Sequence, residues 1–150
     1  MSRVLVAIAG SEFDQQAVEE ALGLLGSDHQ YLFLTVEHGV TAALAGGADP
    51  SDPVLVPEEA FADAEHGARE EGKRSLQAII DRLGIRAEIR VETGDPGEQI
   101  VAVAETEKVA LIVVGSHHKG TLRRVLGRSV SDDVAHHAPC PVLLVRHPAT

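Results

Sequence analysis

The apolar run from Val109 to Val114 constrains the fold of this chain more than any other stretch. The run is short, rich in β-branched residues and free of polar residues, which is typical of a strand buried on both faces of a sheet. Such a strand needs helices on both sides, because an uncovered face would expose its apolar side chains to water. The run therefore predicts an inner strand of a parallel α/β sheet.

Strand and helix patterns alternate along the rest of the chain. Further strands are predicted at 3–8, 31–36, 85–91 and 141–145, and the third of these alternates apolar with charged residues, as a half-exposed strand does. Apolar residues at three- and four-residue spacing predict helices over 14–25, 57–83, 98–105 and 131–137. The first two are expected to stop at Gly26 and Gly84. In the second, Gly67 and Gly72 are expected to weaken the middle, and its apolar stripe consists of Phe61, Ala64, Ala68, Leu76, Ile79 and Leu83. We interpret the glycine-rich segment 37–56 as a long loop. This order predicts a single domain over residues 1–150: an α/β, Rossmann-like, five-stranded and mostly parallel sheet with helices on both faces.

Composition and charge narrow the class of partner. Aromatic residues make up only 3% of the chain, which leaves no platform for stacking bases. The net charge of −10 argues against general nucleic-acid binding, which needs a basic surface. No apolar run approaches the roughly 20 residues that span a bilayer, and the N-terminus lacks a signal-peptide pattern. A single cysteine excludes an intramolecular disulfide framework. We therefore expect no nucleic-acid partner, no membrane partner and a cytoplasmic location.

The segment that follows the Val109 strand is the candidate binding site. From Gly115 to Ser131 the chain has no acid, whereas Lys119 and Arg128 are two of its four basic residues. Ser129 stands at a predicted helix start, where free backbone amides attract anions. Ligands in open α/β sheets bind outside the carboxyl ends of the strands. The pattern indicates a site for a small anionic ligand, and the alternative is a solvated basic surface.

Histidine and cysteine provide weaker candidates. His117–His118 and His136–His137 are adjacent pairs, which do not share a helix face, and no Cys, Asp or Glu partner has metal-site spacing. No metal site is predicted from these residues. Cys140 lies between two prolines beside the last predicted strand, and we favour a small buried residue over a nucleophile.

Five sequence blocks stand out along the chain: VLVAIAGS at 4–11, GDP at 94–96, LIVVGS at 111–116, GRSVS at 127–131 and CPVLLV at 140–145. Taken together, they resemble the universal stress protein family. The blocks follow the family order and cover essentially the whole chain. The resemblance implies a parallel α/β fold of the adenine nucleotide α-hydrolase-like type and a role in stress resistance or regulation without a common catalytic reaction. It also implies a homodimer formed through the last strand, Pro141 to Val145.

One branch of that family binds ATP through the motif G-x2-G-x9-G-[ST]. Gly115 and Ser129 fit the first and last positions, whereas His118 and Arg128 replace the second and third glycines. A side chain in place of such a glycine either fills the phosphate site or changes its geometry. Arg128 therefore has two interpretations: it blocks the site, or its guanidinium clamps a phosphate.

The resemblance also assigns the other candidate contacts. Ala9 stands where the ATP-binding branch carries an aspartate near the ribose, and Val36 matches the position whose backbone meets adenine. Lys119, Val130 and Ser131 complete the candidate set. The three departures, at the aspartate and at two glycines, lead us to expect a non-catalytic, regulatory stress-response dimer with a degenerate nucleotide site, for which ATP or AMP are the candidate ligands.

The alternative hypothesis is an ATP-binding member with slow hydrolysis, in which His117 or His118 assists a water molecule. No acid lies in the loop after Gly115 to hold a magnesium ion, which favours the first hypothesis. The sequence assigns no catalytic residue.

Overall fold

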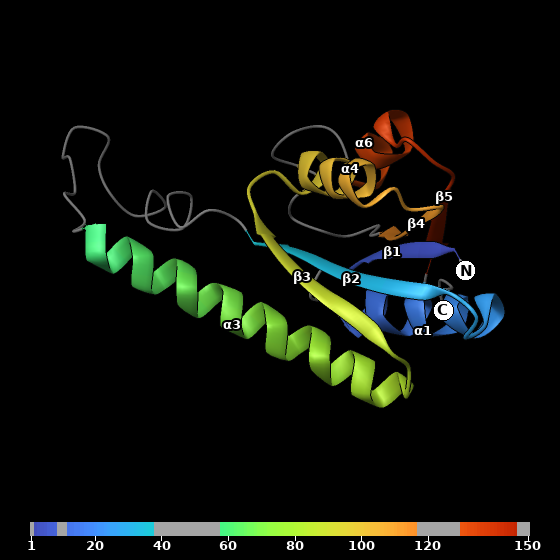
Figure 1. Cartoon of the computed structure of the whole chain (residues 1–150), viewed down its shortest axis with the longest axis horizontal. Coiled ribbons are helices and arrows are strands. Elements are labelled where there is room, and N and C mark those ends of the chain that lie inside the picture. The colour runs from blue at the N-terminus through green and yellow to red at the C-terminus, as the bar shows by residue number, and fades with distance from the viewer. Residues whose placement is uncertain (1, 9–11, 38–57, 117–129, 147–150) are drawn as a thin grey trace.

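Figure 1 shows the computed structural model, which describes residues 2–8, 12–37, 58–116 and 130–146. These residues form, in chain order, β1 (Arg3–Ala7), α1 (Glu12–Leu25), β2 (Gln30–Glu37), α3 (Glu58–Leu83), β3 (Ala87–Thr93), α4 (Pro96–Glu107), β4 (Leu111–Ser116), α6 (Val130–His137) and β5 (Val142–Arg146). The alternation of strands and helices predicted from the sequence is confirmed.

The five strands form one sheet in the order β3-β2-β1-β4-β5, and every neighbouring pair is parallel. The chain first moves outward from β1 to β2 and β3, and then returns across β1 to β4 and β5. The order therefore reverses between β1 and β4, which is the topological switch point of an open α/β sheet. β3 and β5 form the two edges.

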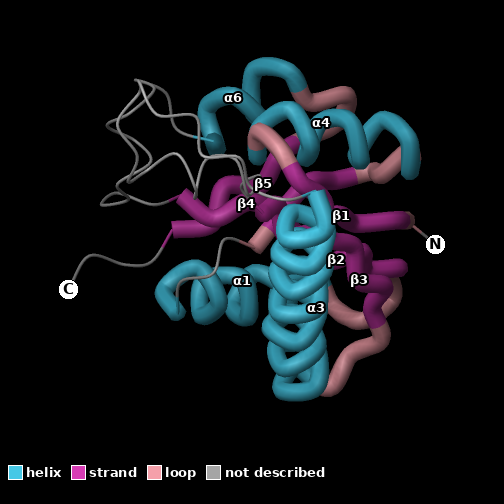
Figure 2. Tube along the Cα trace, turned by 90° about the vertical axis from the view of Figure 1, so that its left-hand side faces the viewer, coloured by secondary structure: helices cyan, strands magenta, loops and turns pink. Residues whose placement is uncertain are grey.

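Helices cover both faces of the sheet, with α1 and α3 on one face and α4 and α6 on the other (Figure 2). Alternate residues of the inner strands point to opposite faces, so the core divides into two clusters. The α1-side cluster contains, among others, Val4, Val6, Val18, Tyr31, Phe33, Ile79 and Val113. The α4-side cluster contains Leu5, Ala7, Leu32, Leu34, Ile100, Val103, Ala104, Val109, Ile112, Val114 and Val134. Neighbouring residues of β4 enter both clusters, which confirms that the Val109 run is buried on both faces.

Helix α4 begins earlier than predicted. Pro96 and Gly97 belong to the helix, although the sequence analysis began the helix at Glu98. The carboxylate of Asp95 accepts a hydrogen bond from the backbone N–H of Glu98 at 3.0 Å and caps the helix. The Asp-Pro pair suggests a turn when seen alone, but it also suits an N-cap followed by the first helical position.

The apolar stripe predicted along α3 packs only in its C-terminal half. The buried residues of the helix are Gly72, Leu76, Ile79 and Ile80. Ala64, which was assigned to the same stripe, is exposed. Figure 1 gives the reason: the first half of α3 extends past the end of the sheet, where no strand lies beneath it.

Candidate functional site

The carboxyl ends of the strands all lie at the same end of the sheet, as the parallel topology requires. Ala7 of β1 lies beside Leu34 of β2 on one side and Val114 of β4 on the other. The next residue of β4 is Gly115, and two residues beyond Leu34 is Val36. The predicted contacts Val36 and Gly115 therefore lie at this carboxyl end of the sheet, next to the switch point. Ligands of open α/β sheets bind in the crevice at such a point.

Three of the predicted site residues share this place in the fold. Val36 at the end of β2 and Val130 at the start of α6 both pack against the α4-side cluster, so they lie on the same face of the sheet. Each of them, like Gly115, is only partly buried and keeps surface available to a ligand. Ser131 differs, because it is 7% exposed and offers a ligand little contact.

The other predicted contacts lie outside the described residues. They are Ala9, His118, Lys119, Arg128 and Ser129. The predicted loop lies there too, apart from its first residue, Glu37, which is the last residue of β2. The two hypotheses for Arg128, block or clamp, stay predictions.

The first turn of α6 contains two acids, whose effect on an anionic ligand the sequence pattern did not indicate. Asp132 and Asp133 lie in that turn, directly after the acid-free stretch. A methyl group added to Gly97 would lie 3.2 Å from Asp133 Cβ and 3.5 Å from Asp95 Oδ2, so the starts of α4 and α6 are closely packed. Carboxylates near a helix N-terminus stabilise the helix dipole themselves. They also reduce the attraction of the same terminus for a second anion, so a phosphate there would need a nearby cation.

Neither a metal centre nor a reactive thiol emerges in the part of the chain that the structure describes. No group of three His, Cys, Asp or Glu side chains is placed to hold a metal ion among these residues. His137 Nδ1 lies 2.9 Å from the carbonyl oxygen of Asp133 within α6. Cys140 is partly buried against the α4-side cluster, and this burial raises the pKa of its thiol. A raised pKa keeps the thiol protonated at neutral pH, which opposes a nucleophilic role.

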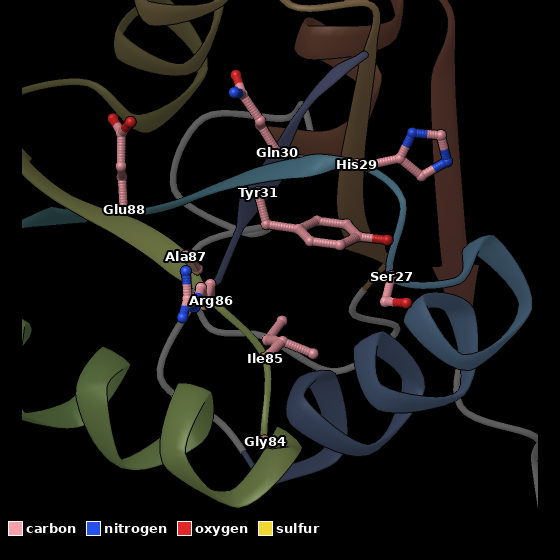
Figure 3. A pocket seen from close by; sticks show the side chains of 9 residues that line it. All are labelled: Ser27, His29, Gln30, Tyr31, Gly84, Ile85, Arg86, Ala87 and Glu88. Carbon is pink, nitrogen blue, oxygen red and sulfur yellow. The ribbon is translucent and has the colours of Figure 1, made fainter. Parts of the chain in front are cut away.

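A cavity of about 600 Å³ lies at the opposite end of the sheet, where β2 and β3 begin, between residues 27–31 and 84–88. Figure 3 shows Tyr31 and Ile85 on the same side of the strands, whereas Gln30 and Glu88 point the other way. The Tyr31 hydroxyl donates a hydrogen bond to the carbonyl oxygen of Gly26 at 2.5 Å. Both α1 and α3 end beside this cavity, and helix C-termini carry partial negative charge. The cavity is therefore poorly suited to a phosphate.

Comparison with known proteins identifies the family. The model of the universal stress protein family matches residues 1–146. The chain is 30% identical over 148 residues to universal stress protein YxiE of Bacillus subtilis, which covers 97% of this chain and 99% of the relative.

The chain belongs to the universal stress protein family.

Solved structures agree on the fold. Protein MJ0577 of Methanocaldococcus jannaschii superposes with a TM-score of 0.75 at 23% identity, covering 99% of this chain and 98% of that one. A universal stress protein family member of Arabidopsis thaliana, solved with AMP bound, gives a TM-score of 0.66 at 24% identity, covering 99% and 94%. A further universal stress protein was solved in complex with cAMP. The universal stress protein fold predicted from the sequence blocks is confirmed.

No helix within the described residues is long and apolar enough to cross a membrane. Although α3 has 26 residues, acids and bases interrupt it throughout.

Proposed function

We propose that this universal stress protein is a non-catalytic regulator that binds an adenosine monophosphate, such as AMP or cAMP, at the carboxyl ends of its strands. The observation that carries the proposal is that Val36 and Gly115 lie at the carboxyl ends of β2 and β4, on either side of β1, while Val130 packs against the same cluster as Val36. The structural relatives solved with AMP or cAMP support the choice of ligand class.

The preference for a monophosphate rests on which parts of the motif this chain keeps. The position expected to meet adenine, Val36, remains partly exposed at the end of β2. His118 and Arg128 replace the two glycines that would admit a longer phosphate chain. Asp132 and Asp133 add negative charge beside the helix start that a phosphate would approach. We expect one phosphate to be accommodated there and three to be disfavoured.

Calorimetric titration with AMP, cAMP, ADP and ATP tests the proposal. We expect AMP or cAMP to bind more tightly than ATP, and Gly115→Leu to weaken binding, because a glycine at the end of β4 allows a closer approach of backbone to ligand than a residue with a side chain. Gly23→Leu is the matched control, since Gly23 lies in α1 with no atom within 4 Å of an added Cβ. Micromolar ATP binding that exceeds AMP binding would contradict the proposal.

The same titration separates the two hypotheses for Arg128. If the guanidinium clamps the phosphate, Arg128→Gly weakens AMP binding, because a charge-assisted hydrogen bond is lost. If the side chain blocks the site, the same substitution strengthens ATP binding. The double variant His118→Gly and Arg128→Gly restores the glycines of the motif and should bind ATP best if both side chains obstruct it.

We further propose that the protein works as a homodimer paired through β5. Support comes from the position of β5 at an edge and from Leu144, whose side chain is 39% exposed there. Leu143 packs against the α1-side cluster and Val145 is buried, so Leu144 is the residue to change without disturbing the core. In dilute solution Leu144→Asp should give monomers by light scattering, whereas Leu24→Asp, at a 91% exposed position on α1, should leave the dimer intact. A Leu144→Asp protein that is as dimeric as the wild type at the same dilution would place the interface elsewhere.

In this proposal residues 1–150 act as one universal stress protein domain in the cytoplasm, where adenine nucleotides are abundant. The family assignment and the predicted ligand support this location.

A further inference from the structure

Strand β3 forms the second open edge of the sheet. Within the described residues it pairs only with β2, from Ala87 to Thr93. Alternate backbone N–H and C=O groups of such a strand face outward and can pair with another strand. Seven residues are enough for a stable ladder, so the side chains decide whether this edge accepts a partner.

The side chains of this edge alternate in charge. Glu88 and Arg90 lie beside Leu32 and Leu34 of β2, which belong to the α4-side cluster, so both charged residues are on that face. Continuing the two-residue spacing in both directions gives the row Arg86, Glu88, Arg90, Glu92. Charged side chains on an edge strand usually discourage pairing, but this row contains two charges of each sign and can be matched by a row in the opposite order.

The row is self-complementary in one antiparallel register. When two copies of β3 are centred on Ile89, Glu88 stands opposite Arg90 of the second copy, and Arg86 stands opposite Glu92. The two-fold axis repeats both pairs, giving four opposite-charge pairs in total. A centre on residue 88 would place Glu88 against itself, and a centre on residue 90 would place Arg90 against itself. The charge pattern therefore selects the Ile89 register over its immediate neighbours.

The ion pairs within the chain hold three charges of the row in place. Glu88 Oε2 lies 2.5 Å from an Arg3 guanidinium nitrogen. Arg90 contacts Glu92 at 2.8 Å and Glu107 at 2.6 Å. Side chains that are already ordered lose less conformational entropy when a second strand docks.

Arg86, the remaining charge of the row, and part of the apolar surface on the opposite face stay uncovered in the described part of the chain. Arg86 is exposed and makes no ion pair within the described part of the molecule. Ala87 and Ile89, on the α1-side face, pack against that cluster but stay only partly buried. In the Ile89 register Ala87 faces Val91 of the second copy and Ile89 faces itself, so pairing would cover apolar surface as well as satisfy Arg86.

We propose that β3 is a second self-association surface, on which two copies of this chain pair antiparallel with Ile89 at the two-fold axis. The pairing joins two five-stranded sheets into one. It is independent of the proposed nucleotide site, because it uses an edge strand rather than the crevice at the switch point. Together with the proposed β5 dimer it would link dimers into larger assemblies.

The test uses the full chain carrying Leu144→Asp, which blocks the β5 edge, and measures association by sedimentation velocity over a range of concentrations. We expect this protein, monomeric in dilute solution, to form dimers as its concentration is raised. Adding Arg86→Glu should raise the dissociation constant about tenfold, because two attractive cross-strand pairs become repulsive. Arg86→Lys, which keeps the positive charge, should leave the dissociation constant unchanged.

Two outcomes would overturn the proposal. A Leu144→Asp protein that stays monomeric throughout would show that β3 does not pair. A dimer that Arg86→Glu leaves unchanged would show that a different surface holds the copies together. Since Arg86 is exposed, loss of folding is not expected, and circular dichroism of each variant checks this directly. Nucleotide binding should be the same in all these variants, which separates failure of this inference from failure of the proposed function.

Discussion

Gly72 packs closely against the sheet, and replacing it with alanine should distort the candidate site. A methyl group on Gly72 would lie 3.1 Å from Thr35 Cγ2, 3.2 Å from Glu37 Oε1 and 3.4 Å from Val91 Cγ1. The glutamate can swing away, because its carboxylate is the end of a flexible side chain. Thr35 and Val91 are β-branched and stiff at χ1, so the helix itself must shift.

Gly67 provides the matched control in the same helix. A methyl group there meets no atom within 4 Å, so Gly67→Ala should gain about 1 kcal/mol in free energy of unfolding from helix propensity alone. Gly72→Ala gains the same propensity but incurs an overpacking cost of about 1–3 kcal/mol. We therefore expect Gly72→Ala to be about 2 kcal/mol less stable than Gly67→Ala, a difference of about 4–8 °C in Tm for a domain of this size.

Urea unfolding followed by circular dichroism measures the difference, and nucleotide titration measures its effect on the site. Thr35 and Glu37 flank Val36, so a shift of α3 should weaken binding of AMP or cAMP in Gly72→Ala but not in Gly67→Ala. Equal stabilities for the two variants would refute the argument that close packing, rather than helix propensity, governs Gly72.

Three further predictions follow from single contacts. Tyr31→Phe should cost about 1 kcal/mol at pH 7 through the lost hydrogen bond to Gly26. Burial, and secondarily the charge of Asp28, raises the pKa of Tyr31 above 10.0. The contribution of the hydroxyl to the free energy of unfolding is therefore complete below pH 10 and is lost as pH rises through the folded-state pKa. The difference in free energy of unfolding between wild type and Tyr31→Phe, measured with urea, should become smaller over that pH range. Cys140 should react with a thiol reagent more slowly than a free cysteine at pH 7–8, because burial raises its pKa, and reaction at the free rate would contradict this. Asp95→Ala should destabilise the protein by about 1 kcal/mol, whereas Asp95→Asn, which keeps an oxygen acceptor, should cost much less in the same urea assay.

Much of the fold could be predicted because its signals are local. The unbroken apolar run at Val109 indicated a doubly buried strand, and neighbouring residues of β4 do enter both core clusters. Gly26 and Gly84 were predicted to stop helices, and both adopt positive φ angles, 83° and 65°. For the candidate site, parallel topology places Val36 and Gly115 at the carboxyl ends of β2 and β4, and their contact with a ligand stays a prediction.

The errors arose where distant segments decide the outcome. Gly72 was predicted only to weaken α3, because its sequence neighbours do not show that Thr35 and Val91 lie against it. The α3 stripe was extended to Ala64, because periodicity cannot tell where the sheet beneath a helix ends. Asp132 was interpreted only as part of a helix-start signal, because the sequence pattern does not show how its charge and that of Asp133 affect a ligand at the helix start.

The sequence by itself determined the parallel α/β class, the family and the order of the elements, because periods of two and 3.6 residues and short motifs are properties of neighbouring residues. Only the tertiary structure decided which strands form the edges, and therefore that the alternating charges around Ile89 line an open edge. It also decided that Glu107 of α4 forms ion pairs with both Arg3 of β1 and Arg90 of β3. These contacts link residues far apart in the chain, and their partners are fixed by how the helices and strands pack rather than by any local pattern.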